Sequence, residues 1–311
     1  MIRREAGDAV LHDVPDYPSP YTGGRYSFYV KFLLSLPGLF RGIRREHTAV
    51  EALHRRLRFR RVISDNRYGV HLRGAPSYLI THQMRFLAPG RIRLFERRSE
   101  RFVANFSDRF AGYLIPDEEE GGLTGDLSHD LLFVRPEMAH YVGILSDFRA
   151  EEVDEDIDLF VSISGPEPQR TRFERMVMEQ VRGLEGLRVV VSRGTSESDR
   201  VRRDGPIEIH DYMPAPDRAA HLSRARVVVT RSGYSTLMDL AAMGKHALLV
   251  PTPGQTEQEY LARKHLGERH WAYQDQRRFD LRKGQSRALA LIPPRMSAER
   301  TVDRVFGAVD L

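Results

Sequence analysis

The chain has 311 residues, of which 41% are hydrophobic, enough for one large domain or two domains of about 150 residues. It contains no cysteine, which excludes disulfides, thiolate zinc sites, iron–sulfur clusters and a cysteine nucleophile. No apolar run approaches the roughly 18 residues that a membrane-spanning helix needs. The first residues lack the apolar core of a signal peptide. These features predict a cytoplasmic protein.

The positive charge is unevenly distributed along the chain. The formal net charge is +5, and only four of the 48 basic residues are lysines. Residues 1–110 hold 21 basic and 10 acidic residues, whereas residues 151–311 hold 25 of each. The arginine excess is typical of codon bias and accompanies no recognition motif, so we expect no nucleic-acid partner. The basic first part suits anionic lipid or a phosphorylated substrate.

The first part of the chain has a mixed α/β pattern. Its apolar spacing predicts helices over 26–40, with one proline, and 46–57, then strands over 60–65 and 76–83. Residues 101–117 are expected to form a helix followed by a strand. The acidic stretch 147–158 lies between two apolar segments and indicates a domain junction. We therefore expect an N-terminal lobe over 1–148 and a C-terminal lobe over 149–311.

The second part alternates strands and helices regularly. Apolar runs of strand length are separated by segments with helical spacing, and each run is nearly continuous. This pattern is typical of a parallel sheet covered on both faces, so we predict a Rossmann-like lobe. The expected strands are 159–164, 187–192, 207–213, 226–230 and 246–251, and the expected helices are 171–184, 218–223, 235–244 and 256–268.

Ligands of parallel α/β sheets bind at the carboxyl ends of the strands, and one such end carries a distinctive sequence. Arg231-Ser232-Gly233-Tyr234-Ser235-Thr236 follows the strand 226–230 and opens a helix. Gly233 permits close backbone approach, while Ser235 and Thr236 bring hydroxyls and free N–H groups to a helix N-terminus, which favours phosphate. An ordinary helix cap by serine or threonine explains the same residues.

The segment 227–268, VVVTRSGYSTLMDLAAMGKHALLVPTPGQTEQEYLARKHLGE, resembles the donor-binding half of MurG-type, family 28, GT-B glycosyltransferases. The order Arg-Ser-Gly-x-x-Thr-x-x-acid, then Gly, Val-Pro and a Gln-containing helix matches over about 40 residues. Further similarity covers 77–83, 141–148 and 210–213. The resemblance implies an α/β fold of the GT-B type, with two Rossmann-like lobes and a donor cleft between them. It suggests an uncharacterised bacterial subgroup of these transferases.

The resemblance also implies roles for residues of the second lobe. Tyr212 and Met213 would contact the uracil, and Asp239, where the family has Glu, would bind the ribose. Gln258 and Glu259 fall where the family has Gln-Gln at the sugar hydroxyls, and the change to Glu259 leaves the donor sugar open. Arg193 is expected either to reach a phosphate or to remain solvated. Arg231 is expected among the donor-binding residues. The expected diphosphate-binding group is Gly165, Arg170, Ser232, Gly233, Ser235 and Thr236.

A general base is expected on the first lobe, at the ends of two predicted strands. Asp65 is the first candidate and His82, whose reference pKa is suitable, is the second. Structural roles are open for both, because Asp65 can cap a turn with Asn66 and His82 can be a hydrogen-bonded buried histidine.

An apolar patch with a basic rim lies in the segment 26–45. Such a composition fits an interfacial helix on an anionic membrane, and MurG-like enzymes use a patch of this kind to reach a lipid-linked acceptor. A core helix with a solvated arginine end is the alternative. The patch consists of Phe28, Phe32, Leu36, Phe40, Arg41, Arg44 and Arg45.

The resemblance implies an inverting, metal-independent hexosyltransferase. Its donor would be a UDP-sugar, such as UDP-N-acetylglucosamine, and its acceptor a lipid-linked or cell-envelope glycan at the inner face of the plasma membrane. No cofactor or metal is expected, since the Asp-x-Asp spacing in 154–158 precedes a strand and reads as a solvated linker. The oligomeric state stays open. A non-catalytic UDP-sugar-binding protein and a UDP-sugar 2-epimerase are the alternatives.

The family's opening strand and Gly-rich loop are not found before Val14, so we expect a shortened N-terminus.

Overall fold

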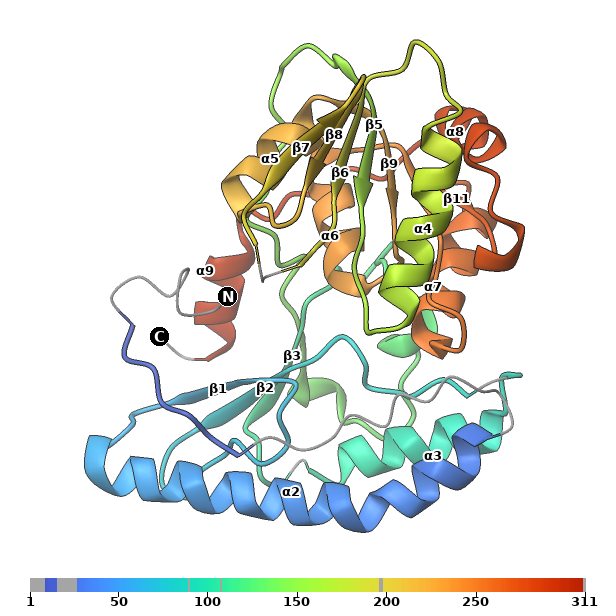
Figure 1. The fold of residues 1–311 in the computed structure, drawn as a ribbon. Coiled ribbons are helices and arrows are strands. Elements are labelled where there is room, and N and C mark those ends of the chain that lie inside the picture. The colour runs from blue at the N-terminus through green and yellow to red at the C-terminus, as the bar shows by residue number, and fades with distance from the viewer. Residues whose placement is uncertain (1–8, 16–26, 89, 107, 196–197, 310–311) are drawn as a thin grey trace. The chain divides into compact units, whose positions relative to one another are not determined.

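The computed structural model describes residues 9–15, 27–88, 90–106, 108–195 and 198–309, with side chains in the first helix described from residue 34 onward. The chain divides into two compact units, residues 1–143 with 301–311 and residues 144–300. The sequence placed the division after residue 148 and assigned the whole C-terminus to the second lobe. The structure differs because the last helix packs its apolar side chains into the first unit. The two units carry separate sheets (Figure 1).

The first unit is built on a four-stranded parallel sheet of order β1-β2-β3-β4. Its long helix α2 runs unbroken through Pro37, where the sequence suggested two segments. Apolar and acidic side chains at helical spacing, Ile43, Glu46 and Val50, are buried and hold the second half of α2 on the unit. The elements are α2 (Ser27–Leu57), β1 (Val62–Asp65), β2 (Ser77–Ile80), α3 (Arg93–Ala104), β3 (Gly112–Ile115), β4 (Ala139–Tyr141) and α9 (Thr301–Ala308).

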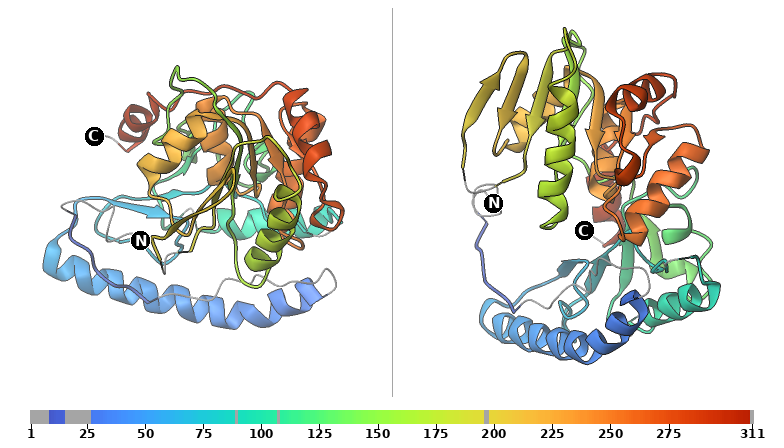
Figure 2. Two further views of the ribbon diagram at one scale, coloured as in Figure 1. Left: turned by 45° about the horizontal axis from the view of Figure 1, so that its top comes forward. Right: turned by 45° about the vertical axis from the view of Figure 1, so that its right-hand side comes forward.

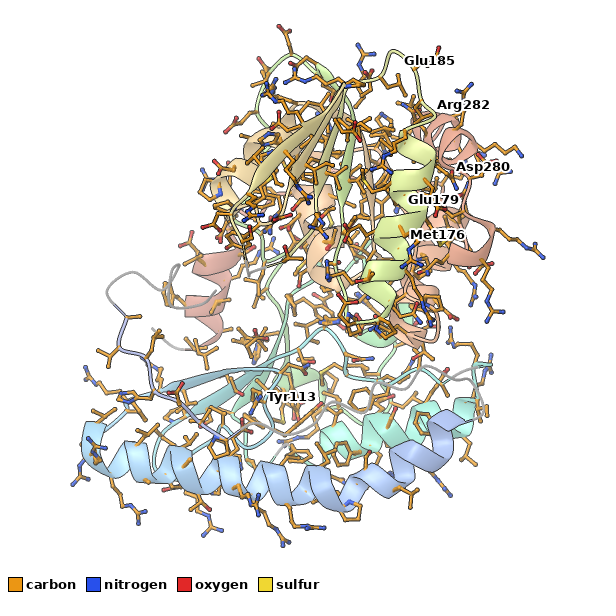
Figure 3. The ribbon with its side chains drawn as sticks, viewed as in Figure 1. Tyr113, Met176, Glu179, Glu185, Asp280 and Arg282 are labelled. Carbon is orange, nitrogen blue, oxygen red and sulfur yellow. The ribbon has the colours of Figure 1, made fainter. Side chains whose placement is uncertain are left out.

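The core of the first unit joins β3 to α3. Tyr113, labelled in Figure 3, is fully buried, and its hydroxyl donates a hydrogen bond to the carbonyl of Val103 at 3.0 Å. On the same strand Leu114 packs with Val309 from the end of the chain. The helix α9 therefore completes the first unit.

The second unit is a seven-stranded sheet of order β11-β10-β9-β5-β6-β8-β7, parallel except for the edge strand β7. Its strands are the predicted apolar runs, plus β7 and β11. The sequence missed β7, VRRD, because an exposed antiparallel edge strand needs no apolar face. The elements are β5 (Ile157–Ser162), α4 (Gln169–Val181), β6 (Val189–Ser192), β7 (Val201–Asp204), β8 (Ile207–His210), α5 (Ala215–Ser223), β9 (Ala225–Thr230), α6 (Tyr234–Met243), β10 (Ala247–Leu249), α7 (Thr256–Gly267), β11 (Ala272–Tyr273) and α8 (Leu281–Leu289).

Helices cover both faces of this sheet (Figure 2). On one face, Phe173 and Val177 of α4 and Leu281 of α8 pack against the odd-numbered valines and leucines of β5, β6 and β9. On the other face α5 packs against β5 and β9, and the ring of His221 lies near that of Phe160. A parallel sheet buried on both faces explains the continuous apolar strand sequences.

No helix in the part of the chain that the structure describes is both long and apolar enough to cross a membrane.

Candidate functional site

The order of the second sheet reverses between two neighbouring parallel strands. From β5 the chain crosses to β6 on one side, and the later strand β9 lies on the other side. Ser162 and Thr230 are paired in register, so both strands end at the same level. The loops after two such strands diverge and leave a crevice in which doubly wound α/β proteins bind ligands. The loops 163–168 and 231–233 therefore form the candidate site.

Helix α6 begins at this edge with an open N-terminus. Gly233 is its N-cap residue, and no side chain caps the first turn. That turn holds no acidic residue, and Ser235 is exposed while Thr236 is half-buried. The neighbouring helix α7 differs, because Glu257 and Glu259 lie in its first turn. The N–H groups of the first turn and the positive end of the helix dipole make α6 suitable for an anion.

Gly233 leaves space that nothing in the described structure fills. A Cβ atom at Gly233 would meet no described atom within 4 Å beyond the residue itself and its two chain neighbours. Its φ of −68° and ψ of 142° are accessible to any residue. Neither the backbone nor the packing of the described residues explains the glycine, so the open space suits a ligand at the helix N-terminus.

Gly165 lies in the opposite loop, after β5, and its backbone does require glycine. Its φ is +107°, which L side chains rarely adopt. A Cβ there would lie 3.5 Å from the Oγ1 atom of Thr252, a buried hydroxyl without a hydrogen-bond partner. The loop after β5 thus approaches the loop after β10 closely.

Three buried polar atoms that have no hydrogen-bond partner among the described residues lie near the ends of β9 and β10. They are Oγ1 of Thr230, Nε of Arg231 and Oγ1 of Thr252. Buried polar groups are normally hydrogen-bonded, so unpartnered ones are informative. Neither threonine is among the predicted site residues, although each follows an apolar strand run directly, in VVVT and LLVPT.

Arg231, predicted to bind the donor, is buried and hydrogen-bonded to the surrounding loops. Its side chain is 1% exposed, and burial lowers its pKa to about 10. Its guanidinium donates to backbone carbonyls of the loops around β10 and of the start of α4, and to Oε1 of Gln276 at 2.8 Å. The carbonyl acceptors are Val250 at 2.9 Å, Pro251 at 3.2 Å and Gln169 at 3.1 Å. One side chain therefore joins four loops at this edge.

Ser232 and Gln258 tie the loop after β9 to α7. The fully buried Ser232 donates from Oγ to the carbonyl of Gln258 at 2.7 Å. The side-chain oxygen of Gln258 accepts from the N–H of Thr252 at 2.8 Å, and Glu259 accepts from the N–H of Gly254 at 3.0 Å. Ser232 thus holds the loop rather than facing an open space, and Gln258 and Glu259 shape the loop 252–255.

Two arginines predicted to meet phosphate are ion-paired inside the unit. The guanidinium of Arg193 pairs with Glu174 at 2.5 Å and Asp211 at 2.7 Å, and the hydrogen bond that it donates to Glu174 raises its pKa. Arg170 donates to the carbonyl of Arg193 at 3.1 Å and also pairs with Glu167. Carboxylates from α4 and from the loop after β8 therefore already neutralise Arg193 in this conformation.

The loop after β8 carries the two residues predicted to contact the base. Asp211 is buried at its start, and the hydrogen bond from Arg193 lowers its pKa despite burial. Tyr212 is half-buried and Met213 is buried. The ion pairs of Asp211 therefore fix the start of this loop.

Asp239, predicted to bind ribose, lies on α6. Its Oδ1 accepts a hydrogen bond from Oγ of Ser146 at 2.7 Å. Burial raises the pKa of Asp239, so a neutral carboxyl is favoured more than in water. A ribose hydroxyl would have to share or displace Ser146, a competitor that the sequence did not reveal.

The base candidates lie at one edge of the first sheet. Asp65 ends β1 and is exposed, and His82 follows the neighbouring strand β2 and is half-buried. Asp65 is paired in register with Ile80, which lies two residues before His82. The turn after Asp65 is held by Asn66, whose side-chain oxygen accepts from Thr81 at 3.2 Å. The topology therefore brings both candidates to the same edge.

The described side chains of the apolar patch differ in their exposure to solvent. Phe40 is 45% exposed, its ring lies 6.0 Å from that of Phe102, and Leu36 is half-buried. The rim residues Arg41, Arg44 and Arg45 are all exposed. Phe28 and Phe32 belong to α2, but their side chains lie outside the described residues.

The acidic stretch before β5 forms ion pairs. Asp156 pairs with Arg224 at 2.5 Å and with Arg188, and Asp158 pairs with Arg226 at 3.4 Å. The stretch lies at the amino end of β5, opposite to the candidate site. The predicted solvated linker is therefore fastened to the unit by three arginines.

Comparisons with known proteins match parts of the second unit. Residues 172–281 match the glycosyltransferase family 28 C-terminal domain. A curated relative from Methylobacterium radiotolerans, UDP-N-acetylglucosamine--N-acetylmuramyl-(pentapeptide) pyrophosphoryl-undecaprenol N-acetylglucosamine transferase, is 46% identical over 46 residues. These are 15% of this chain and 12% of the relative, so the match spans a small part of the relative's length.

Solved structures share the fold at low sequence identity. The glycotransferase of kitacinnamycin has a TM-score of 0.59 at 15% identity, over 89% of this chain and 78% of that one. The calicheamicin glycosyltransferase CalG4 has a TM-score of 0.55 at 14% identity, over 93% and 80%. A proposed UDP-N-acetylglucosamine 2-epimerase from Listeria monocytogenes has a TM-score of 0.52 at 13% identity, over 88% and 78%. These likenesses confirm the predicted α/β fold of the GT-B type.

Proposed function

We propose that this chain, whose residues 172–281 form a glycosyltransferase family 28 C-terminal domain, transfers a sugar from a UDP donor to an acceptor hydroxyl. The observation that carries the proposal is the open N-terminus of α6 beside Gly233, at the point where the strand order reverses. The space beside Gly233 and the N–H groups at the start of α6 suit a diphosphate. UDP-N-acetylglucosamine is the donor we favour, because the curated relative is named for its transfer.

In the proposed reaction, the acceptor oxygen attacks the anomeric carbon while the bond to the donor phosphate breaks on the opposite face. The configuration at that carbon is inverted, and UDP leaves with added negative charge. The N-terminus of α6 and the backbone near Gly165 would stabilise that charge without a metal ion. Ser235 and Thr236 would add hydroxyl donors, since Ser235 is exposed and Thr236 is half-buried in the first turn of α6.

The proton of the acceptor hydroxyl would pass to a base on the first unit. Asp65 and His82 are the candidates, because both lie at the carboxyl edge of the first sheet. The acceptor we propose is a lipid-linked or cell-envelope glycan at the cytoplasmic membrane face. The exposed Phe40 and the rim Arg41, Arg44 and Arg45 on α2 support contact with an anionic lipid surface.

Calorimetric titration with UDP and with UDP-N-acetylglucosamine tests the donor site. We expect saturable binding of both, without added divalent metal. A folded protein that binds neither would contradict the proposal. Release of UDP that depends on an undecaprenyl-linked acceptor would then establish transfer.

A 2-epimerase is the second candidate function, because one structural neighbour carries that proposed activity. Incubation with UDP-N-acetylglucosamine alone, followed by NMR of the sugar, separates the two. A transferase leaves the C2 configuration unchanged, whereas an epimerase inverts it without an acceptor. Binding without either reaction would instead indicate a nucleotide-sugar-binding protein.

A further inference from the structure

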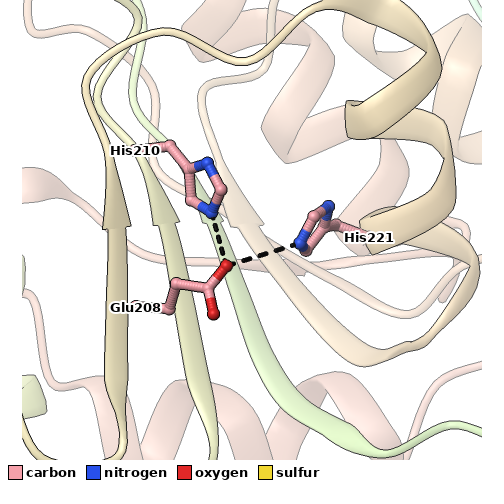
Figure 4. A group of neighbouring side chains, drawn as sticks. All are labelled: Glu208, His210 and His221. Atoms are coloured by element: carbon pink, nitrogen blue, oxygen red, sulfur yellow. Dashed lines mark hydrogen bonds and ion pairs between the residues drawn. The ribbon is translucent and has the colours of Figure 1, made fainter. Parts of the chain in front are cut away.

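Two histidines and a glutamate converge on one face of the second sheet. Glu208 and His210 lie two residues apart on β8, so their side chains point to the same side. His221 reaches them from α5, which covers that face (Figure 4). None of the three belongs to the proposed donor site, and none has a role in the proposed reaction.

The three side chains present their ligand atoms to one point. Nε2 of His210 lies 2.7 Å from Oε1 of Glu208, and Nε2 of His221 lies 3.8 Å from the same oxygen. All three ligand atoms lie within 4.8 Å of one another. A tetrahedral zinc ion with ligands at about 2.0–2.1 Å needs ligand atoms roughly 3.3 Å apart. The observed distances bracket that value, so small side-chain rotations suffice.

The ring of His221 is already oriented for a metal. Its Nδ1 lies 2.7 Å from the backbone carbonyl of Asp217. A carbonyl only accepts hydrogen bonds, so Nδ1 carries the proton and Nε2 of the neutral ring keeps its lone pair. A backbone carbonyl behind the second ring nitrogen is the usual support of a metal-binding histidine.

The cluster is half-buried, which suits an exchangeable ion. The side chains of His210, Glu208 and His221 are 13%, 20% and 19% exposed. An ion can therefore enter, and water can take a fourth position. Arg203 lies 3.1 Å from Oε2 of Glu208, but its side chain is 77% exposed and leaves Oε1 to the histidines.

A second group, His265, Glu268 and His270, is less suitable. Nζ of Lys264 lies 2.8 Å from both carboxylate oxygens of Glu268. The ammonium group of Lys264 thus lies where a metal ion would have to bind Glu268. This group serves as the comparison site in the experiment below.

We infer that Glu208, His210 and His221 bind a divalent transition-metal ion, with Zn²⁺ as the probe. Two imidazole nitrogens and one carboxylate form a known ligand set for zinc, whereas Mg²⁺ and Ca²⁺ prefer oxygen ligands. The ion would link β8 to α5. These elements flank the loop 211–214, so a bound ion would restrict the movement of Tyr212 and Met213. The ion would stabilise the second unit without taking part in sugar transfer.

Titration of the metal-free full chain with Zn²⁺, in the absence of nucleotide, tests this inference independently of the proposed function. We expect one equivalent to bind and to raise the unfolding temperature. Replacing Zn²⁺ by Co²⁺ should give the visible absorption of a four-coordinate ion. His210→Gln and His221→Gln should each weaken binding at least roughly tenfold, since each removes a ligand.

His270→Gln in the comparison site should leave the affinity for Zn²⁺ unchanged. Circular dichroism of each variant confirms that it is folded. The inference is overturned if the wild-type chain binds no Zn²⁺, or if folded His210→Gln and His221→Gln variants bind it as tightly as the wild type. Loss of binding in His270→Gln alone would overturn it as well, by moving the site to α7.

Discussion

The guanidinium carbon of Arg231 lies 4.1 Å from the centroid of the Phe173 ring. Phe173 is fully buried on α4, and Arg231 follows β9, so a cation–π contact joins the two sides of the point where the sheet order reverses. The same guanidinium holds the carbonyls of the surrounding loops. An arginine in the most distinctive sequence motif of this chain thus supports the site from within.

Arg231→Lys should destabilise the second unit. Lysine keeps the charge, but its single ammonium group cannot reach the four acceptors that the planar guanidinium of Arg231 reaches. Buried carbonyls would therefore lose their hydrogen-bond donors. We expect a loss of about 2–4 kcal/mol in the free energy of unfolding. Urea unfolding followed by the fluorescence of Trp271, the single tryptophan, measures it. Arg226→Lys, on a side chain that is 59% exposed, is the control and should change little. Equal midpoints for both variants would contradict the positioning role.

Gly233→Ala should separate binding from stability. The added methyl group meets no described atom beyond its chain neighbours and needs no backbone change, so the unfolding midpoint should shift by no more than the small preference of an N-cap position for glycine over alanine. The methyl group would occupy the space proposed for the diphosphate, and the affinity for UDP should fall roughly tenfold or more. Gly267→Ala is matched, because a Cβ there also meets nothing within 4 Å, and it should bind UDP normally. Unchanged affinity in Gly233→Ala would place the diphosphate elsewhere.

Ser235→Asp should have opposite effects on the helix and on the ligand. A carboxylate in the first turn of α6 interacts favourably with the helix dipole and should stabilise the unit by on the order of 0.3–1 kcal/mol. The same charge repels a diphosphate, so UDP should bind much more weakly than to Ser235→Ala. Calorimetry and thermal unfolding of both variants give the comparison. A Ser235→Asp variant that binds UDP as well as Ser235→Ala does would argue against an anion site at α6.

The first unit should lose stability in mild acid because of His71. Burial, with the positive field of His47, Arg109 and Arg73, lowers the pKa of His71 from 6.5 to about 4. The unfolded chain therefore binds a proton between these values more readily than the folded chain does. Stability falls as the pH drops from about 6.5 to about 4 and then levels off.

His71→Gln removes this titration and should flatten the pH dependence. Between pH 7.5 and pH 4.5 the wild type should lose about 2–3 kcal/mol more than the variant. Urea unfolding followed by circular dichroism at both pH values measures the difference. Parallel losses in the two proteins would show that His71 does not titrate on unfolding.

The local elements follow from sequence because their causes are local. Continuous apolar runs mark the buried strands β5, β6, β9 and β10, and Gly244 ends α6 in the left-handed conformation, as its position after the helix predicts. The motif 231–236 was placed correctly at a strand end that opens a helix. The prediction of two separate helices around Pro37 was wrong, because α2 continues through the proline. Buried residues at helical spacing after Pro37 keep this part of the helix on the first unit.

Tertiary structure decided which polar groups of the site are free to meet a ligand. Arg193 is paired by Glu174 and Asp211, Arg231 by Gln276 and the loop carbonyls, and Asp239 by Ser146. These partners are 18 to 93 residues away along the chain, so no local pattern identifies them. The sequence by itself determined the strand rhythm, the family-like motif and the helix that opens at Gly233, because backbone propensity and apolar period act over a few residues. Only the folded sheet determined that the space beside Gly233 is empty of described atoms, whereas the guanidinium of Arg231 is buried and hydrogen-bonded to the surrounding loops. Burial and hydrogen bonding depend on neighbours that the fold alone brings together.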